Sequence, residues 1–204
     1  MVTGAEFARR ITMSARLSQL VTAAVLVDGF LAGASVDRTF VQLPAFRKTG
    51  VRQWAAFSRN ADLGHRAFLW YPSLAISGTA LSIAAALKGR REQVPPVSAG
   101  WLNAAAILAA AGLLTTIGAA PNMLRLRNAS DDYPVLKRSF EGFEYWQNIR
   151  GTLQALAFVA NVLSMRSLRR RRPELFPSRA LPLPSSRALL PPRFLAGGEG
   201  GEAG

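Results

Sequence analysis

The sequence predicts an all-α fold: a four-helix transmembrane bundle followed by a disordered C-terminal tail rich in Pro, Arg and Gly. Half of the 204 residues are hydrophobic, and they gather in four long windows that contain one charged side chain, Asp28. A helix rises 1.5 Å per residue, so about 20 such residues cross the ~30 Å core of a bilayer. The alternative is a soluble all-α protein with buried helices, because these Ala-rich windows are less hydrophobic than Leu-rich ones.

The first expected span runs from Leu17 to Val36 and follows a segment that contains three arginines. Its length suits a membrane helix. A cleaved secretory signal is the alternative for this region, because Ala32-Gly33-Ala34 resembles an A-x-A cleavage site.

The second expected span covers residues 67–87, is uncharged, and has Trp70 and Tyr71 near its start. Aromatic residues of this kind are enriched at membrane interfaces. The third expected span covers residues 97–120, is also uncharged, and ends at Pro121.

The fourth expected span covers residues 146–165. Its uncharged part, residues 151–165, is too short to cross a bilayer, and extension back to Trp146 places Arg150 in the first turns. All four spans are rich in Ala, Gly, Ser and Thr, which let helix backbones approach closely in a membrane.

Four spans place both termini on one side of the membrane. Lys and Arg lie closer together on that side, so we expect a multi-pass protein of a bacterial-type inner or plasma membrane with cytoplasmic termini. We expect a membrane domain over residues 1–168 and a basic tail over residues 169–204, whose Pro and Gly content is typical of disorder. The cluster Arg166–Arg172 is expected to contact anionic lipid heads.

Charge and composition exclude several function classes. The formal net charge of +13 would ordinarily indicate nucleic acid. Here the cations lie at helix ends and in the tail, so we expect the lipid bilayer as the partner and no nucleic acid. The absence of Cys and the single His exclude disulfides and Cys-based or multi-His metal sites, so we expect no metal and no resident cofactor.

The ends of the four spans that adjoin segments 37–66 and 121–150 meet at one membrane face, so we expect any pocket to open there. Asp28 is a costly residue inside a span, by about 2.5–3.5 kcal/mol, and is expected to face the interior, with Arg150 as a partner. A carboxyl kept neutral by Ser, Thr or backbone groups is the alternative. His65 is the one side chain whose ordinary titration range suits proton transfer at neutral pH, with an interfacial His as the alternative.

One set of residues follows the third span and enters the fourth: Thr115-Thr116, Pro121-Asn122, Leu124 and Trp146-Gln147-Asn148-Ile149-Arg150. Together with four small-residue helices, this pattern resembles the anthrone oxygenase-like membrane proteins over about residues 17–165. Asn148 stands where a His is common in that family.

The resemblance implies a cofactor-independent oxygenase that acts on a hydrophobic aromatic or polyketide-type substrate. A base removes an acidic C–H, and the carbanion then reduces O₂ in an apolar pocket. The catalytic candidates, a base and an anion-stabilising donor, are Asp28, His65 and Arg150. The substrate-binding candidates are Trp70, Tyr71, Asn122, Trp146 and Asn148. The alternative is a non-enzymatic membrane protein, monomeric or oligomeric, that binds a lipid, a quinone-like ligand or a protein partner.

Overall fold

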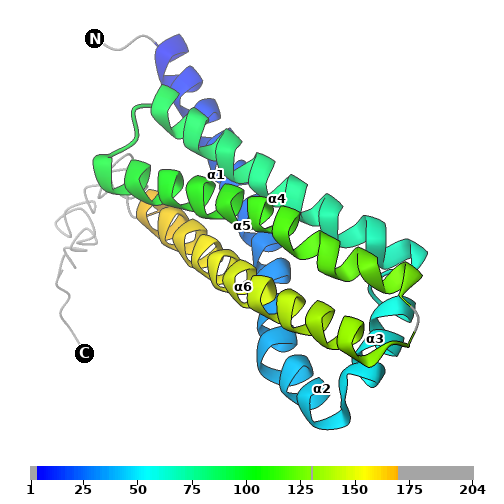
Figure 1. The fold of residues 1–204 in the computed structure, drawn as a ribbon. Coiled ribbons are helices and arrows are strands. Elements are labelled where there is room, and N and C mark those ends of the chain that lie inside the picture. Colours follow the sequence, from blue (N-terminus) through cyan, green and yellow to red (C-terminus); the bar gives the residue numbers. More distant parts are fainter. Residues whose placement is uncertain (1–3, 130, 170–204) are drawn as a thin grey trace, which may run out of the picture. The chain divides into compact units, whose positions relative to one another are not determined.

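A computed structural model describes the backbone of residues 4–129 and 131–169 and, within these ranges, the side chains from residue 15 onward except those at positions 65, 67 and 68. Within these ranges every regular element is a helix, which confirms the all-α prediction for the part described (Figure 1). The elements in chain order are α1 (Gly4–Asp37), the π-helix η1 (Arg38–Gln42), α2 (Leu43–Thr49), α3 (Val51–Asn60), α4 (His65–Arg91), α5 (Pro96–Asn128) and α6 (Tyr133–Arg169).

Three helical stretches are long and apolar enough to cross a membrane: Ala15–Thr49, Leu69–Arg91 and Pro96–Asn128. No more than 33% of the most apolar window of each is buried inside the protein. Leu26 and Ile117, for example, are 70% and 73% exposed. Soluble proteins rarely expose apolar surface of this extent, whereas lipid accommodates it. These helices therefore indicate a membrane protein.

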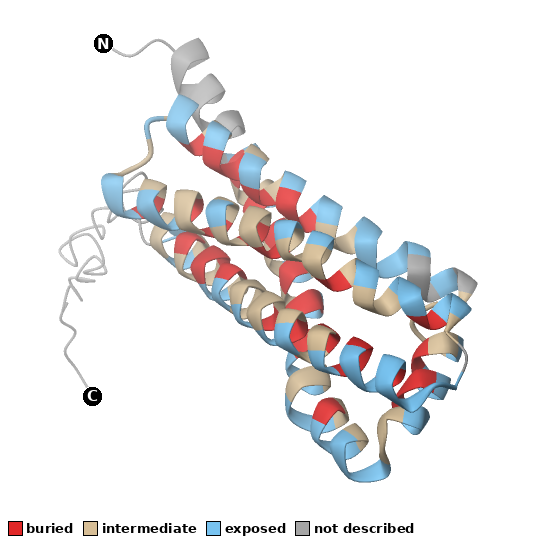
Figure 2. Cartoon of the chain, viewed as in Figure 1, coloured by how far each residue is buried: buried red, intermediate tan, exposed pale blue. Residues whose placement is uncertain are grey.

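The four long helices form a ring of contacts. α1 packs against α4 and α6, while α5 packs against α4 and α6. Buried positions lie mainly on the faces that these helices turn toward one another (Figure 2). The cavity described below is therefore enclosed by elements far apart in the sequence.

Several helices extend beyond the ends that hydropathy predicts. α1 continues into η1 and α2, and α5 passes through Pro121 to Asn128. Pro is tolerated inside membrane helices when neighbours satisfy the freed backbone groups. α6 begins at Tyr133 rather than Trp146, so Arg150 lies several turns inside the helix. Hydropathy locates where a helix is apolar, and a helix can continue beyond that point.

Segment 37–66 is largely helical rather than an open loop. Gly50 separates α2 from α3 with a φ of +100°, a backbone conformation that favours glycine. Trp54 of α3 is 1% exposed, with its ring 5.2 Å from that of Phe140 and 5.8 Å from that of Phe143, both on α6. Arg59 adds hydrogen bonds to the backbone at the end of α5. This short helical layer is thus attached to the bundle beside the cavity.

The expected tail lies outside the described residues, apart from Arg169. Of the basic cluster Arg166–Arg172, the structure describes residues 166–169, which form the last turn of α6. The domain boundary and the disorder of the tail stay predictions.

Candidate functional site

A cavity of about 420 Å³ lies among α1, η1, α4, α5 and α6, at the end of the bundle that adjoins segment 37–66. This is the end at which we expected a pocket, and the size and apolar character are typical of small-molecule sites. Its large apolar lining side chains are Leu31, Leu63, Leu113, Met123, Leu124 and Phe143. Its polar and aromatic-polar lining side chains are Ser35, Asp37, Arg38, Gln42, Asp62, Tyr71, Thr116, Gln147, Arg150 and Gln154.

Helix α6 supplies a row of polar side chains, which we call the polar stripe: Gln147, Arg150, Gln154, Asn161 and Ser164. Their spacing of three, four or seven residues places them on one helix face. Gln147 is 1% exposed, and Asn161 and Ser164 are 0% exposed, so this face points into the protein. The polar stripe also lowers the hydropathy of α6, which is why α6 is not among the three apolar stretches.

An ion pair between two lining residues lies at the wall of the cavity. Arg38 of η1 donates a hydrogen bond from Nη2 to Oδ1 of Asp62, which lies just before α4, and the two side chains are only 17% and 11% exposed. The Arg38 guanidinium also lies 5.7 Å from the ring centroid of Phe143. π-Helical turns are rare in proteins, and those that occur are often found at functional sites. The turn η1 places Arg38 and Gln42 on the cavity wall.

Arg150 is differently placed, because no carboxylate pairs with it in the described part of the chain. Its guanidinium donates to Oε1 of Gln147, which is a neutral acceptor. The Arg150 Nε, the Gln147 Nε2 and the Gln42 Oε1 are buried without a hydrogen-bond partner. A buried polar group left without a partner costs about 1–3 kcal/mol, so these groups are suited to binding a ligand.

Two of the predicted site residues, Tyr71 and Arg150, line the cavity. His65 begins α4, and its side chain lies outside the described residues. The predicted site residues that are described but do not line the cavity are Asp28, Trp70, Asn122, Trp146 and Asn148.

The expected ion pair between Asp28 and Arg150 is not formed. Asp28 is buried and accepts hydrogen bonds from Asn161 Nδ2 at 2.7 Å and Ser82 Oγ at 3.3 Å. Asn161 follows Arg150 by 11 residues on α6, or about 16 Å along the helix. The expectation was wrong because this part of α6 lies beside the end of α1, where Gly151 faces Ser35 and Thr39, and the distance to Asp28 is too long for an Arg side chain to span.

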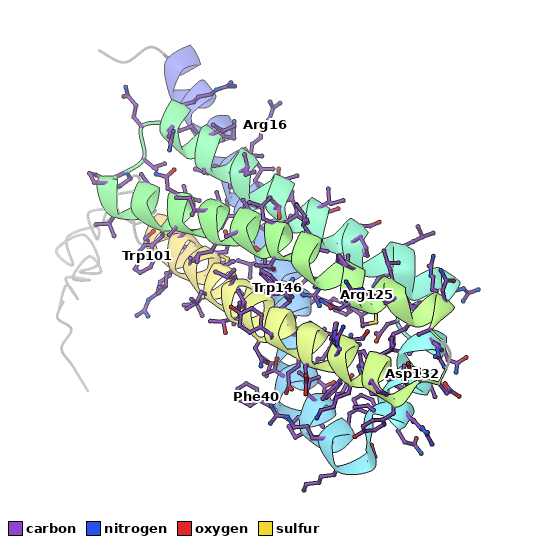
Figure 3. All side chains as sticks on the ribbon, viewed as in Figure 1. Arg16, Phe40, Trp101, Arg125, Asp132 and Trp146 are labelled. Atoms are coloured by element: carbon purple, nitrogen blue, oxygen red, sulfur yellow. The ribbon has the colours of Figure 1, made fainter. Side chains whose placement is uncertain are left out.

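The aromatic and amide candidates have packing or surface positions. Trp146 contacts the backbone of α5 at Gly118, and Figure 3 shows it at the junction of α5 and α6. Asn122 donates to the Gly118 carbonyl at 3.0 Å. Trp70 is 57% exposed and Asn148 is exposed.

Sequence reasoning did not single out Gln42, Ser35, Gln147 or Gln154 as site residues. Gln147 and Gln154 could have been found from the period of the polar stripe, which continues into the apolar C-terminal half of α6. The position of Ser35 on the cavity wall could not have been found from the sequence, because it depends on how α1 and α6 pack. Its Oγ donates a hydrogen bond to Oε1 of Gln154 on α6 at 2.5 Å.

The chain was compared with models of protein families, with curated proteins and with solved structures, and it has no significant match to any of them.

Proposed function

We propose that this protein crosses the membrane four times and binds a hydrophobic small molecule in the cavity. The molecule carries an acceptor oxygen, as quinone-like or phenolic compounds do. Arg150 carries this proposal, because its guanidinium lines an apolar cavity with no carboxylate partner among the described residues. An anionic or polarised oxygen would accept the hydrogen bonds that Arg150 Nε and Gln147 Nε2 leave unused.

The fourth span is α6. It closes the ring between α5 and α1, its polar stripe faces inward, and it exposes apolar residues such as Leu156 and Val159 on the outside. A helix with this arrangement satisfies its polar groups inside the bundle and presents apolar side chains to lipid. Both termini then lie on one side, which we assign to the cytoplasm.

The topology can be tested without background labelling, because the chain has no cysteine. Single substitutions Gln53→Cys in α3 and Gln93→Cys between α4 and α5 both fall at exposed positions. In intact cells, a membrane-impermeant maleimide is expected to label position 53 and to label position 93 only after lysis. Labelling of both positions in intact cells would contradict the four-span topology, and the reverse pattern would contradict the orientation.

Ligand binding can be tested on protein purified in mild detergent. Mass spectrometry of solvent extracts identifies molecules that copurify, and decylubiquinone and anthrone serve as defined probes. Each ligand that binds the folded state raises the melting temperature. We expect Arg150→Gln to weaken binding by about 10- to 100-fold, since a hydrogen bond to a charged group contributes about 1.5–3 kcal/mol.

Arg125→Gln is the matched control, because Arg125 is an exposed arginine on α5 outside the cavity lining. It is expected to bind the probe like the wild type. Equal affinities of the wild type and Arg150→Gln would overturn the proposal for the cavity. Loss of binding in Arg125→Gln as well would show an unspecific effect of surface charge.

A second candidate function is cofactor-independent oxygenation, as in the anthrone oxygenase-like family. It is supported by a cation, Arg150, at the wall of an apolar cavity, which suits stabilisation of a carbanion. Oxygen uptake with anthrone tests it, with wild type compared with Asp28→Asn, His65→Ala and Arg150→Gln. We expect uptake to fall in His65→Ala and Arg150→Gln and to persist in Asp28→Asn, because Asp28 lies outside the cavity lining. Uptake that all three variants retain would contradict the catalytic candidates.

A further inference from the structure

A second polar cluster, made of Asp28, Ser82 and Asn161, lies inside the bundle where α1, α4 and α6 meet. The three side chains are 5%, 1% and 0% exposed. Asn161 Nδ2 donates to Asp28 Oδ2 at 2.7 Å and to Ser82 Oγ at 3.0 Å, while Ser82 Oγ donates to the same Asp28 oxygen at 3.3 Å. One carboxyl oxygen thus accepts both hydrogen bonds.

The other carboxyl oxygen of Asp28, Oδ1, faces the backbone of α4. It lies so close to Gly78 that a methyl group at this position would collide with it. The Asn161 Oδ1 is buried beside the cluster without a hydrogen-bond partner. The site is therefore closely built around the carboxyl group, with glycine providing the space for it.

No charged side chain faces this carboxyl group in the described residues. From α4 it meets Gly78 and Ser82, and from α6 it meets Asn161. The nearest charged residue on each helix lies well away from the cluster. Asp37 follows Asp28 by nine residues on α1, Lys88 follows Ser82 by six on α4, and Arg166 follows Asn161 by five on α6. Lys88 forms an ion pair with Glu92 at 3.3 Å, and Arg166 is exposed.

An ionised carboxylate in a membrane interior is costly unless a cation pairs with it. The hydrogen bonds from Ser82 and Asn161 do not neutralise the negative charge of an Asp28 carboxylate, whereas a bound proton does. We propose that Asp28, Ser82 and Asn161 form a binding site for one proton, held by Asp28 as a neutral carboxylic acid at neutral pH. This inference does not depend on what the cavity binds. Leu31, one turn from Asp28 on α1, lines the cavity, so the two sites share a helix.

Infrared spectroscopy of the detergent-solubilised protein tests the proposal directly. We expect the wild-type spectrum minus that of Asp28→Asn, at neutral pH, to contain the C=O band of a protonated carboxylic acid. The same subtraction with Asp37→Asn, which removes an exposed carboxylate, is expected to contain carboxylate bands instead. Carboxylate bands in the Asp28 difference spectrum would overturn the proposal.

A chemical label gives a second measurement on the wild-type protein alone. N,N′-Dicyclohexylcarbodiimide reacts with protonated carboxyl groups in apolar surroundings, and peptide mass spectrometry locates the adduct. We expect Asp28 to be labelled at neutral pH, Asp37 to remain unlabelled, and labelling of Asp28 to decrease as the pH is raised. This result decides the matter if Asp28→Asn does not fold.

The alternative to a proton site at Asp28 is a site that binds Na⁺. A sodium-binding site would keep the carboxylate ionised, so Na⁺ would block the label and carboxylate bands would be present. That outcome would overturn the proton site. Labelling that is unchanged between Na⁺ and choline buffers, together with the protonated C=O band, would support it.

Discussion

The contact between α5 and α6 at Gly118 can be tested by adding one methyl group. An ideal Cβ at this position would lie 2.5–2.8 Å from Cε2, Cζ2 and Cδ2 of the Trp146 ring. Carbon atoms in favourable contact are about 3.5–4.0 Å apart, so Gly118→Ala forces either the ring or the helix to move. We expect the overpacking to cost about 1–3 kcal/mol.

Gly100→Ala is the matched control on the same helix. Nothing lies within 4 Å of a Cβ at position 100. Alanine favours a helix over glycine by about 1 kcal/mol at both positions. Because this contribution is shared, the difference in the free energy of unfolding between the two variants isolates the overpacking. Gly118→Ala is expected to be about 1–3 kcal/mol less stable than Gly100→Ala.

The assay is unfolding in mixed micelles with increasing sodium dodecyl sulfate, followed by circular dichroism. Trp146→Leu in the Gly118→Ala background is expected to restore stability relative to the additive sum of the two changes, with a coupling of about 0.5–3 kcal/mol. Equal midpoints for Gly118→Ala and Gly100→Ala, or strict additivity with Trp146→Leu, would refute the contact. Trp146 would then remain a substrate-binding candidate, as the resemblance implied.

Three further substitutions test other parts of the fold in the same way. Asn161→Leu removes the nearer donor to Asp28 and is expected to cost about 1–3 kcal/mol, and an unchanged unfolding midpoint would contradict the hydrogen bond. Trp54→Ala empties the contact between α3 and α6 and is expected to cost about 3–5 kcal/mol, seen as faster trypsin cleavage around α3; Trp54→Phe should retain most of the resistance. Arg38→Gln leaves Asp62 nearly buried and unpaired, a loss of up to about 3–5 kcal/mol, and adding Asp62→Asn should restore stability. A double variant no more stable than Arg38→Gln would show that the pair contributes nothing.

The sequence was sufficient for the helices and for the membrane assignment. Long uncharged windows, such as residues 97–120, are properties of one segment and its solvent, and they need no tertiary partner to be recognised. The same holds for the burial of Asp28, since an acid inside a span is stable only when it faces the interior. The helix ends were less predictable, because helices continue through Pro121 and past charged residues once neighbours satisfy their polar groups.

The composition of the site was predictable only in part. Arg150 and Tyr71 were predicted as site residues from the sequence, and both line the cavity. Trp146 was a substrate-binding candidate by resemblance, and its packing against the backbone of Gly118 on α5 could not be read from the sequence of α6. Gln147 was recognisable in principle from the period of the polar stripe.

The sequence by itself determined that this protein is helical, that it has apolar spans, and that an acid lies within the first of them. The tertiary structure alone decided that Asp28 meets Asn161 rather than Arg150, and that Arg150 lines the cavity without an ion pair among the described residues. The physical reason is that hydropathy is a sum over one segment, whereas the partner of a side chain depends on the rotation and axial register of two helices. Rotation and register are set by many weak contacts between residues distant in the sequence, and no single window contains them.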